Sequence, residues 1–207
     1  MSEPEARALV DDLREILDRI TDIELDPAVA TRARQHAGAL LAELEGPRRV
    51  RWYEGAEGSE IFDTARDYFE KMSPLRGSLN GVAVPFDVNW AEQDSQRIIG
   101  RINVPRRYEG PPHAVHGGIV AALFDDLLGG VQTLAPPFGM TARLEITYRS
   151  PTPVDTDLIF EGWVHDNGTK YMRAKGTCHA GDTLTAEATA MFIRVDFGEV
   201  AARGQER

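Results

Sequence analysis

One acidic residue stands inside a segment that otherwise has the composition of a buried helix. Asp125 lies in the apolar run Ile119–Leu128, and His116, Gly117 and Gly118 stand immediately before that run. An apolar helix is normally buried, and a buried carboxylate is unfavourable unless it is paired or used in a reaction. Asp125 is therefore the first candidate for a functional group.

The two glycines occupy the expected start of this helix. Backbone N–H groups in the first turn of a helix have no partner within the helix and carry a partial positive charge. Directed at a carbonyl oxygen, the N–H groups of Gly117 and Gly118 could stabilise the negative charge that develops when the carbonyl is attacked. Alternatively, the glycines form a tight turn that packs closely. The residues alone leave the two interpretations equal.

The acidic pair in this helix has several possible roles. Asp125 could act as a general base on a water, or as a nucleophile that forms a covalent intermediate. Asp126 follows directly, and neighbouring residues of a helix point about 100° apart, so one acid could face a site and the other a partner or solvent. We rank Asp125 first and Asp126 second. In the alternative interpretation, both acids lie on a solvated or subunit-facing stripe.

Two histidines stand next to candidate groups. The ring of His116 could orient a substrate or a water, or it could hold the loop before the helix by a bond to the backbone. His179 follows Cys178 in a predicted strand, where adjacent side chains point to opposite faces. We therefore do not interpret Cys178 and His179 as a catalytic pair.

Composition excludes several classes of protein. The net charge of −10 over 207 residues argues against a general binder of nucleic acid or membrane surfaces, although a few arginines could still hold a small anionic ligand. The single cysteine, Cys178, excludes an intrachain disulfide and a cysteine-based zinc site within one chain. The N-terminus has no signal-peptide pattern, and the longest apolar run is too short to span a bilayer. We expect a soluble cytoplasmic protein without a membrane span.

The first part of the chain has helical periodicity. Residues 4–24 space their apolar side chains by three and four, and Asp26-Pro27 is typical of the start of a second helix that Gly46-Pro47 ends. We expect residues 1–46 to form a helical hairpin that packs on its own domain or on a partner subunit. Residues 47–80 form a linker region with a short helix from Asp63 to Met72.

From residue 82 the apolar period changes to two, which predicts strands around the apolar helix. The first strand runs from Val82 to Trp90. In the strand after the helix, Ala142, Leu144, Ile146 and Tyr148 alternate with Thr141, Arg143, Glu145, Thr147 and Arg149. The last two strands carry mostly small residues on one face: Met172, Ala174, Gly176 and Cys178, then Ala186, Ala188, Ala190 and Phe192. Small side chains allow close approach of the helix at 117–130. The pattern predicts an α+β fold, in which a curled antiparallel sheet surrounds a central helix.

Residues 81–197 resemble a hotdog-fold thioesterase of the phenylacetate-pathway (PaaI-like) type. The residues that carry the resemblance are Tyr108–Pro112, His116-Gly117-Gly118, Asp125, Thr141 and Tyr148–Pro151. It implies acyl groups on coenzyme A, or on acyl carrier protein, as substrates. It also implies a site at the interface of a homodimer, or of a dimer of dimers, and no metal or cofactor. The hairpin at 1–46 and the tail at 198–207 lie outside it.

The resemblance also implies roles for individual residues. Asp125 occupies the position of the catalytic carboxylate, Gly118 that of the oxyanion donor, and Thr141 that of a hydroxyl that positions the water or the carboxylate. Arg149 stands where the family often places a basic residue against coenzyme A phosphates, and guanidinium suits phosphate geometry. The structural alternatives are a β-branched strand residue for Thr141 and a solvated charge for Arg149.

These residues lead to three hypotheses for the function. The first is an acyl-CoA thioesterase of lipid metabolism, with a water activated by Asp125, an oxyanion at the Gly118 amide, and coenzyme A leaving as thiolate. The second is a hotdog-fold acyl-CoA hydratase or dehydratase, whose usual His-containing motifs are not visible in the sequence. The third is a non-catalytic acyl-CoA-binding module. The sequence does not fix the acyl group.

Overall fold

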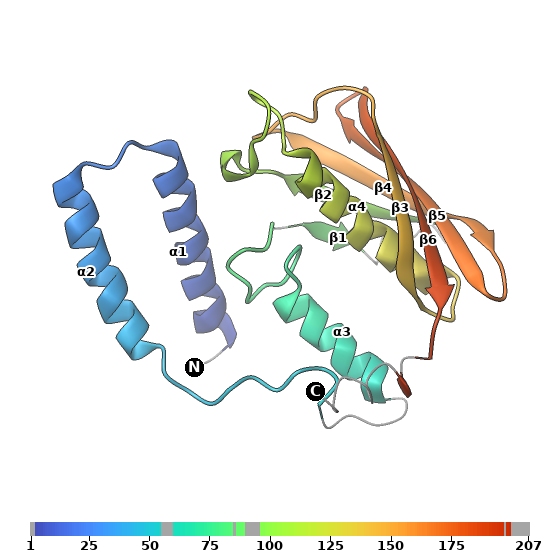
Figure 1. The fold of residues 1–207 in the computed structure, drawn as a ribbon, viewed down its shortest axis with the longest axis horizontal. Helices are drawn as coiled ribbons and strands as arrows, with labels where there is room; N and C mark the ends of the chain where they lie inside the picture. Colours follow the sequence, from blue (N-terminus) through green and yellow to red (C-terminus); the bar gives the residue numbers. More distant parts are fainter. Residues whose placement is uncertain (1–2, 55–59, 85, 90–95, 197, 200–207) are drawn as a thin grey trace.

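A six-stranded antiparallel sheet curls around one apolar helix, α4 (Gly117–Val131), in the computed structural model (Figure 1). The strand order is β1-β2-β4-β5-β6-β3. The strands are β1 (Asp87–Asn89), β2 (Arg97–Asn103), β3 (Gly139–Tyr148), β4 (Asp157–Asn167), β5 (Tyr171–Ala180) and β6 (Thr183–Arg194). The structure describes residues 3–54, 60–84, 86–89, 96–196 and 198–199. The predicted α+β arrangement of a sheet around a central helix is confirmed.

The core lies between α4 and the concave face of the sheet. Leu123, Phe124, Leu127 and Leu128 of α4 have no exposed surface, and the ring of Phe124 meets that of Phe160 at a centroid distance of 5.0 Å. By length and composition alone, residues 117–134 would also be able to cross a membrane. Their burial against the sheet is that of a core helix.

Small residues allow α4 to lie this close to the strands. All of the inward-facing small residues predicted on β5 and β6 are buried. A Cβ atom added at Gly176 would lie 2.7 Å from the backbone oxygen of Glu161 and 3.1 Å from a methyl of Leu128. Glycine at this position therefore follows from close packing rather than from an unusual backbone angle.

The packing at Gly176 predicts a specific loss of stability. We expect Gly176→Ala to lower the free energy of unfolding by about 1–3 kcal/mol, because the neighbouring atom is backbone and cannot move independently. Gly129→Ala is the matched control, because nothing lies within 4 Å of an added Cβ there. Alanine at that helix position should raise stability by roughly 0.5–1 kcal/mol. Urea denaturation measures both, and equal midpoints for the two variants would contradict the packing.

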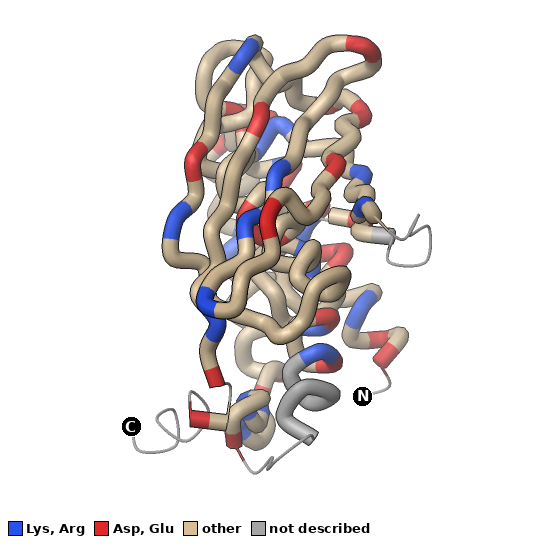
Figure 2. Tube along the Cα trace, turned by 90° about the vertical axis from the view of Figure 1, so that its right-hand side faces the viewer, with Lys and Arg blue, Asp and Glu red and all other residues tan. Residues whose placement is uncertain are grey.

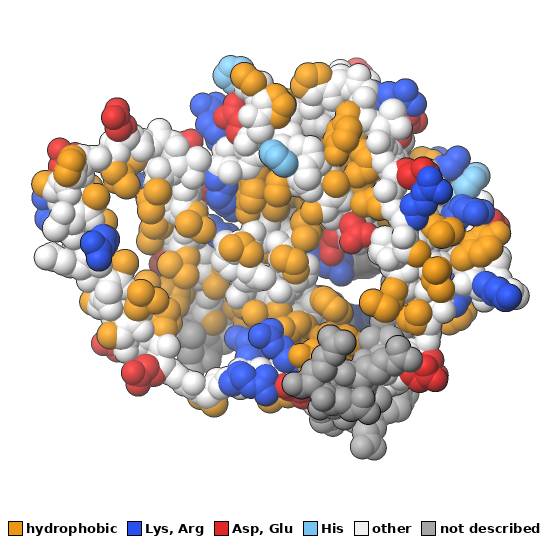
Figure 3. Space-filling model, in the orientation of Figure 1, with side chains coloured by type: hydrophobic (Ala, Val, Ile, Leu, Met, Phe, Trp, Pro, Cys, Tyr) orange, Lys and Arg blue, Asp and Glu red, His pale blue; other side chains and the backbone are white. Residues whose placement is uncertain are grey.

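The helical part of the chain precedes the sheet. It contains α1 (Glu3–Asp22), α2 (Pro27–Glu43) and α3 (Glu60–Met72), and two short 3-10 helices, η1 (Arg106–Tyr108) and η2 (Gln132–Leu134), flank α4. The predicted start of α2 is confirmed, since the Asp26 carboxylate accepts hydrogen bonds from the backbone N–H groups of Ala28 and Val29. No residue of α1 or α2 is buried, and apolar side chains line both helices on the face shown in Figure 3.

The strand predicted from Val82 to Trp90 is wrong in its length. Among the described residues of this stretch, Asp87–Asn89 form a strand, and Val82 is 61% exposed. The reason is a local turn, in which the Asn80 carbonyl accepts from the N–H of Ala83 and the Asn80 side chain accepts from the N–H of Val82. This turn uses backbone groups that a longer strand would need for its ladder. Trp90 lies outside the described residues.

The single cysteine lies inside the core. Cys178 has no exposed surface, and burial raises the pKa of its thiol to about 11. Since the thiolate is the reactive form, we expect the native protein not to react with Ellman's reagent at pH 8, and the denatured chain to release one equivalent. Reaction at native conditions would contradict the inward orientation of Cys178. The same measurement gives the background for any assay that counts released thiol.

Candidate active site

The helix N-terminus is held by its own N-cap residue. The Nδ1 atom of His116 accepts a hydrogen bond from the N–H of Gly118 at 3.0 Å, and the His116 carbonyl accepts from the N–H of Ile119 at 2.8 Å. The His116 N–H donates to the carbonyl of Tyr108. Of the two roles considered for His116, the structure therefore contains the one in which its side chain holds the turn before the helix.

Gly117 packs against the far end of β3. Its carbonyl accepts a hydrogen bond from the Tyr148 hydroxyl at 2.7 Å, and a Cβ added at Gly117 would lie 3.2 Å from that hydroxyl. Among the residues that the structure describes, no acceptor is bonded to the Gly117 N–H. The two glycine amides therefore differ: one is capped by His116, and the other is not.

A carboxylate and a hydroxyl meet in the second half of α4. The Thr141 Oγ1 atom donates a hydrogen bond to Asp125 Oδ1 at 3.0 Å, although the two residues come from different elements. Asp125 is exposed, which corrects the expectation that this acid is buried in the helix. An accessible carboxylate that is oriented by a hydroxyl can accept a proton from a water and keep a fixed direction while doing so.

A β-bulge explains why Thr141 faces Asp125. The register of β3 on β6 pairs Leu144 with Ala190 and Arg143 with Met191, and then pairs Thr141 with Phe192. Ala142 is the extra residue. A bulge re-aims the side chain next to it, so Thr141 shares the inward face with Leu144 instead of pointing outward. The regular alternation of the sequence is therefore interrupted at Ala142, since strict alternation would place Thr141 and Leu144 on opposite faces.

The less exposed acid of the pair is Asp126. Its carboxylate lies 3.4 Å from the Nε atom of Arg76, and the two side chains are 16% and 21% exposed. Burial raises the pKa of Asp126; the Arg76 cation opposes this effect, and Asp125 adds to it. The two adjacent acids thus have different surroundings. Asp125 is exposed and accepts a hydrogen bond from Thr141, whereas Asp126 is mostly covered and lies against Arg76.

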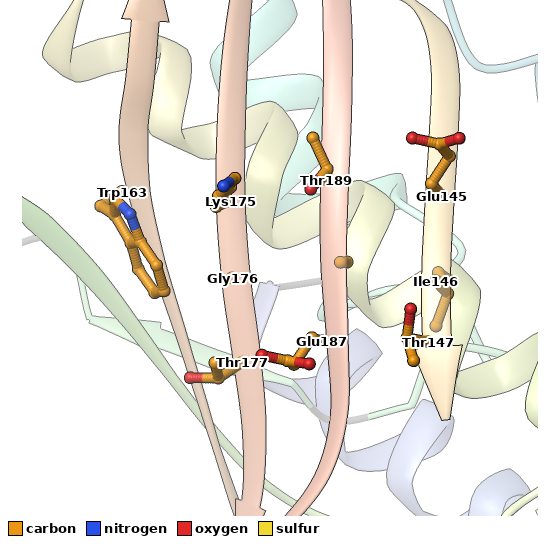
Figure 4. Close-up of a pocket in the computed structure, with 10 residues that line it drawn as sticks. Glu145, Ile146, Thr147, Trp163, Lys175, Gly176, Thr177, Glu187 and Thr189 are labelled. Carbon is orange, nitrogen blue, oxygen red and sulfur yellow. The ribbon is translucent and has the colours of Figure 1, made fainter. Parts of the chain in front are cut away.

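Arg149 lies away from these groups within one chain. Its guanidinium pairs at 2.5 Å with Glu187 of β6, and Glu187 lies on the face of the sheet opposite α4. The same outer face has a polar pocket of about 570 Å³, lined by Glu187 together with residues such as Trp163 and Lys175 (Figure 4). Seen from the side, acidic and basic residues are interspersed over the described chain (Figure 2). None of the predicted site residues lines this pocket, and Arg149 is only the ion-pair partner of one residue that does.

Two contributors to the site were missed in the sequence. Tyr148 could have been found from its position at the end of a predicted strand, because an aromatic hydroxyl on the helix-facing side of a sheet needs a polar partner. Arg76 had no usable signal, because it lies in an irregular segment and meets Asp126 across fifty residues of sequence. Within the described part of the chain, no three His, Cys, Asp or Glu side chains gather as metal ligands would.

Solved structures with this fold include proteins named as members of the thioesterase superfamily. The thioesterase superfamily protein RHA08564 aligns with a TM-score of 0.74 at 21% identity, over 91% of this chain and 94% of its own. The protein has the hotdog fold of the thioesterase superfamily. Zebrafish thioesterase superfamily member 2 aligns with a TM-score of 0.52 at 18% identity, over 63% of this chain and 96% of its own. The RHA08564 match extends over most of the chain, beyond the hotdog domain itself.

Sequence similarity to curated proteins covers part of this hotdog protein. The acyl-coenzyme A thioesterase THEM4 of Mus musculus is 32% identical over 90 residues, which is 42% of this chain. The Xenopus laevis THEM4 is 33% identical over 89 residues. The matched segment spans about two fifths of the length of these relatives, 39% and 40%. No family model matches the sequence.

Proposed function

We propose that this protein hydrolyses acyl-CoA thioesters to a free acid and coenzyme A. The observation that carries the proposal is the hydrogen bond between Thr141 and the exposed Asp125 on the central helix of a hotdog fold. Asp125 takes a proton from a water, and the water oxygen attacks the thioester carbonyl. The tetrahedral intermediate then collapses, its C–S bond breaks, and coenzyme A leaves as a thiolate. The sequence similarity to THEM4 acyl-CoA thioesterases supports this reaction class.

The start of α4 would stabilise the oxyanion. The Gly117 N–H can donate to a thioester oxygen directly, whereas the Gly118 N–H can donate once the oxygen takes the place of His116 Nδ1. Both amides carry the partial positive charge of a helix N-terminus. This arrangement fits Gly117 to substrate binding and Gly118 to charge stabilisation during attack.

Spacing along the helix favours a site built from two subunits. Asp125 follows Gly118 by seven positions, which corresponds to about 10 Å along the helix axis. A reacting carbonyl must lie about 3 Å from its oxyanion donor, and a general base about 3 Å from the attacking water. Two groups that lie about 10 Å apart on one helix satisfy both conditions poorly. Two helices related by a two-fold axis can satisfy them together.

The exposed edge of the sheet offers the axis for such a dimer. β3 is an edge strand of ten residues, and a long, unpaired edge is a template for pairing with another chain. If β3 pairs antiparallel with its own copy near the centre of the strand, the Tyr148 end of one subunit lies beside the Thr141 end of the partner's strand. Tyr148 is bonded to Gly117 and Thr141 to Asp125, so this pairing would bring the two halves of the site together.

Arg149 stands near the same junction, at the end of β3. Its surface ion pair with Glu187 is solvent-exposed and weak, since such pairs contribute about 0–1 kcal/mol. A phosphate group of coenzyme A could therefore replace Glu187 as the partner of the guanidinium. We retain Arg149 as the residue proposed to bind coenzyme A.

An acyl-CoA panel tests the proposed function. The purified full-length protein is incubated with straight-chain, branched and aromatic acyl-CoA substrates, and released thiol is followed over time. We expect catalytic release of coenzyme A from at least one acyl class. Absence of thiol release across the panel, with acyl-CoA binding retained, would contradict the proposal and favour the binding module.

A further inference from the structure

Besides an ion pair between Glu3 and Lys71 of α3, helix α1 contacts two segments that both touch the active-site helix. One is the segment 73–82, and the other is η1 (Arg106–Tyr108). The second contact is an ion pair between Asp18 of α1 and Arg107, whose side chain is 9% exposed. Figure 1 shows α1 lying beside the hotdog body, whereas α2 lies on its far side.

The first contact fixes the backbone of the segment that carries Arg76. The Nη2 atom of Arg14 donates to the carbonyls of Gly77 and Asn80, both at 2.9 Å. The Arg14 side chain is largely buried. The segment is also tied to the end of α3, since the Leu79 N–H donates to the carbonyl of Lys71. Arg76 is therefore presented from a backbone that is held on two sides.

Each of these segments then holds α4 at a different point. Arg76 pairs with Asp126, in the middle of the helix and next to Asp125. Tyr108 directly follows Arg107, and its backbone carbonyl accepts a hydrogen bond from the N–H of His116 at the start of the helix. These two contacts of α1 are therefore connected to two parts of the proposed site. The contact of Arg14 is connected to the general base, and that of Asp18 to the oxyanion donors.

We propose that α1 and Arg76 form a positioning unit for the active-site helix, in which Arg14 holds the 73–82 segment and Arg76 fixes the rotation of α4 through Asp126. This inference rests on the proposed function, because the group that it positions is Asp125. Arg76 and Asp126 act through Asp125 and do not touch the substrate. A rotation of the helix that turned Asp126 from Arg76 would also turn Asp125 from Thr141.

Two kinds of substitution test this unit in the full-length protein. We expect Arg76→Gln to lower kcat by about tenfold with little change in KM, because small misplacements of a catalytic group reduce rate strongly. The acidic limb of the kcat/KM profile should move to higher pH, because the Arg76 cation lowers the pKa of Asp126, the acid next to Asp125, and its loss removes that effect. Arg76→Lys should restore most of the rate. Arg14→Ala should lower kcat several-fold, whereas Arg19→Ala, on the same helix but exposed and paired with Glu15, should not.

The outcomes separate this inference from the proposed function. If the wild-type protein hydrolyses acyl-CoA and Arg76→Gln lowers only thermal stability, with kcat and the acidic limb unchanged, the positioning role is wrong and the function stands. If wild-type protein releases no thiol, the function itself fails. If Arg76→Gln does not fold, the double variant Arg76→Gln/Asp126→Asn replaces it, because it removes both charges of the pair and leaves neither without its partner. A wild-type kcat in that double variant, or in Arg14→Ala, overturns the inference.

Discussion

Asp125→Asn should abolish most acyl-CoA hydrolysis while leaving the fold intact. Loss of a general base lowers kcat by roughly 10²–10⁴-fold. Asparagine keeps the oxygen that accepts from Thr141, so the substitution removes basicity and charge without removing the hydrogen bond. Asp125 is exposed, and substitutions at exposed positions usually change stability by less than about 0.5 kcal/mol. Steady-state thiol release and a thermal melt measure the two expectations.

Asp126→Asn is the matched variant for this experiment. It removes a carboxylate from the neighbouring position, but from one that is nearly buried and paired with Arg76. We expect it to change stability more than Asp125→Asn does, and to lower kcat less. A larger loss of kcat in Asp126→Asn than in Asp125→Asn would contradict the ranking of the two acids. Near-normal turnover in Asp125→Asn would exclude it as the base.

A mixed dimer of two inactive subunits should regain activity. In the proposed dimer, each site takes its oxyanion donors from one subunit and Asp125 from the other. Pairing Asp125→Asn with Gly118→Val, whose side chain would fill the carbonyl position, leaves one site with both substitutions and one site with neither. Assemblies purified through two different tags should therefore have about half of the wild-type rate.

The two parent homodimers are the controls for the mixed dimer. Each should be inactive, and each should have the wild-type mass in solution by light scattering. A doubly tagged dimer that is as inactive as both parents would show that Gly118 and Asp125 of one chain serve the same site. A monomeric wild-type protein with full activity would contradict the shared site altogether.

The sequence was most informative where a pattern repeats. The small residues of β5 and β6 predicted the close approach of α4, because a period of two marks the inward face and Gly176 leaves room there. The cap at Asp26 could be predicted as well, since a capping side chain acts on its own local backbone. Such features depend on neighbours in the sequence or on a simple alternation.

The details of the site could not be predicted in the same way. Thr141 reaches Asp125 only because Ala142 is inserted as a bulge, and an alternating pattern cannot reveal one extra residue. Which of the two acids is buried depends on the rotation of α4 about its axis. That rotation is coupled to Arg76, which meets the helix from a distant segment. A contact between distant segments has no local signal in the sequence.

One incubation distinguishes the three functions most directly. The full-length protein is mixed with an excess of a 2-enoyl-CoA of the preferred chain length, and the products are identified by mass. Thioester hydrolysis predicts the free 2-enoic acid and coenzyme A, formed over many turnovers and lost in Asp125→Asn. Formation of a hydroxyacyl-CoA with its thioester intact, or recovery of unchanged enoyl-CoA, would contradict it.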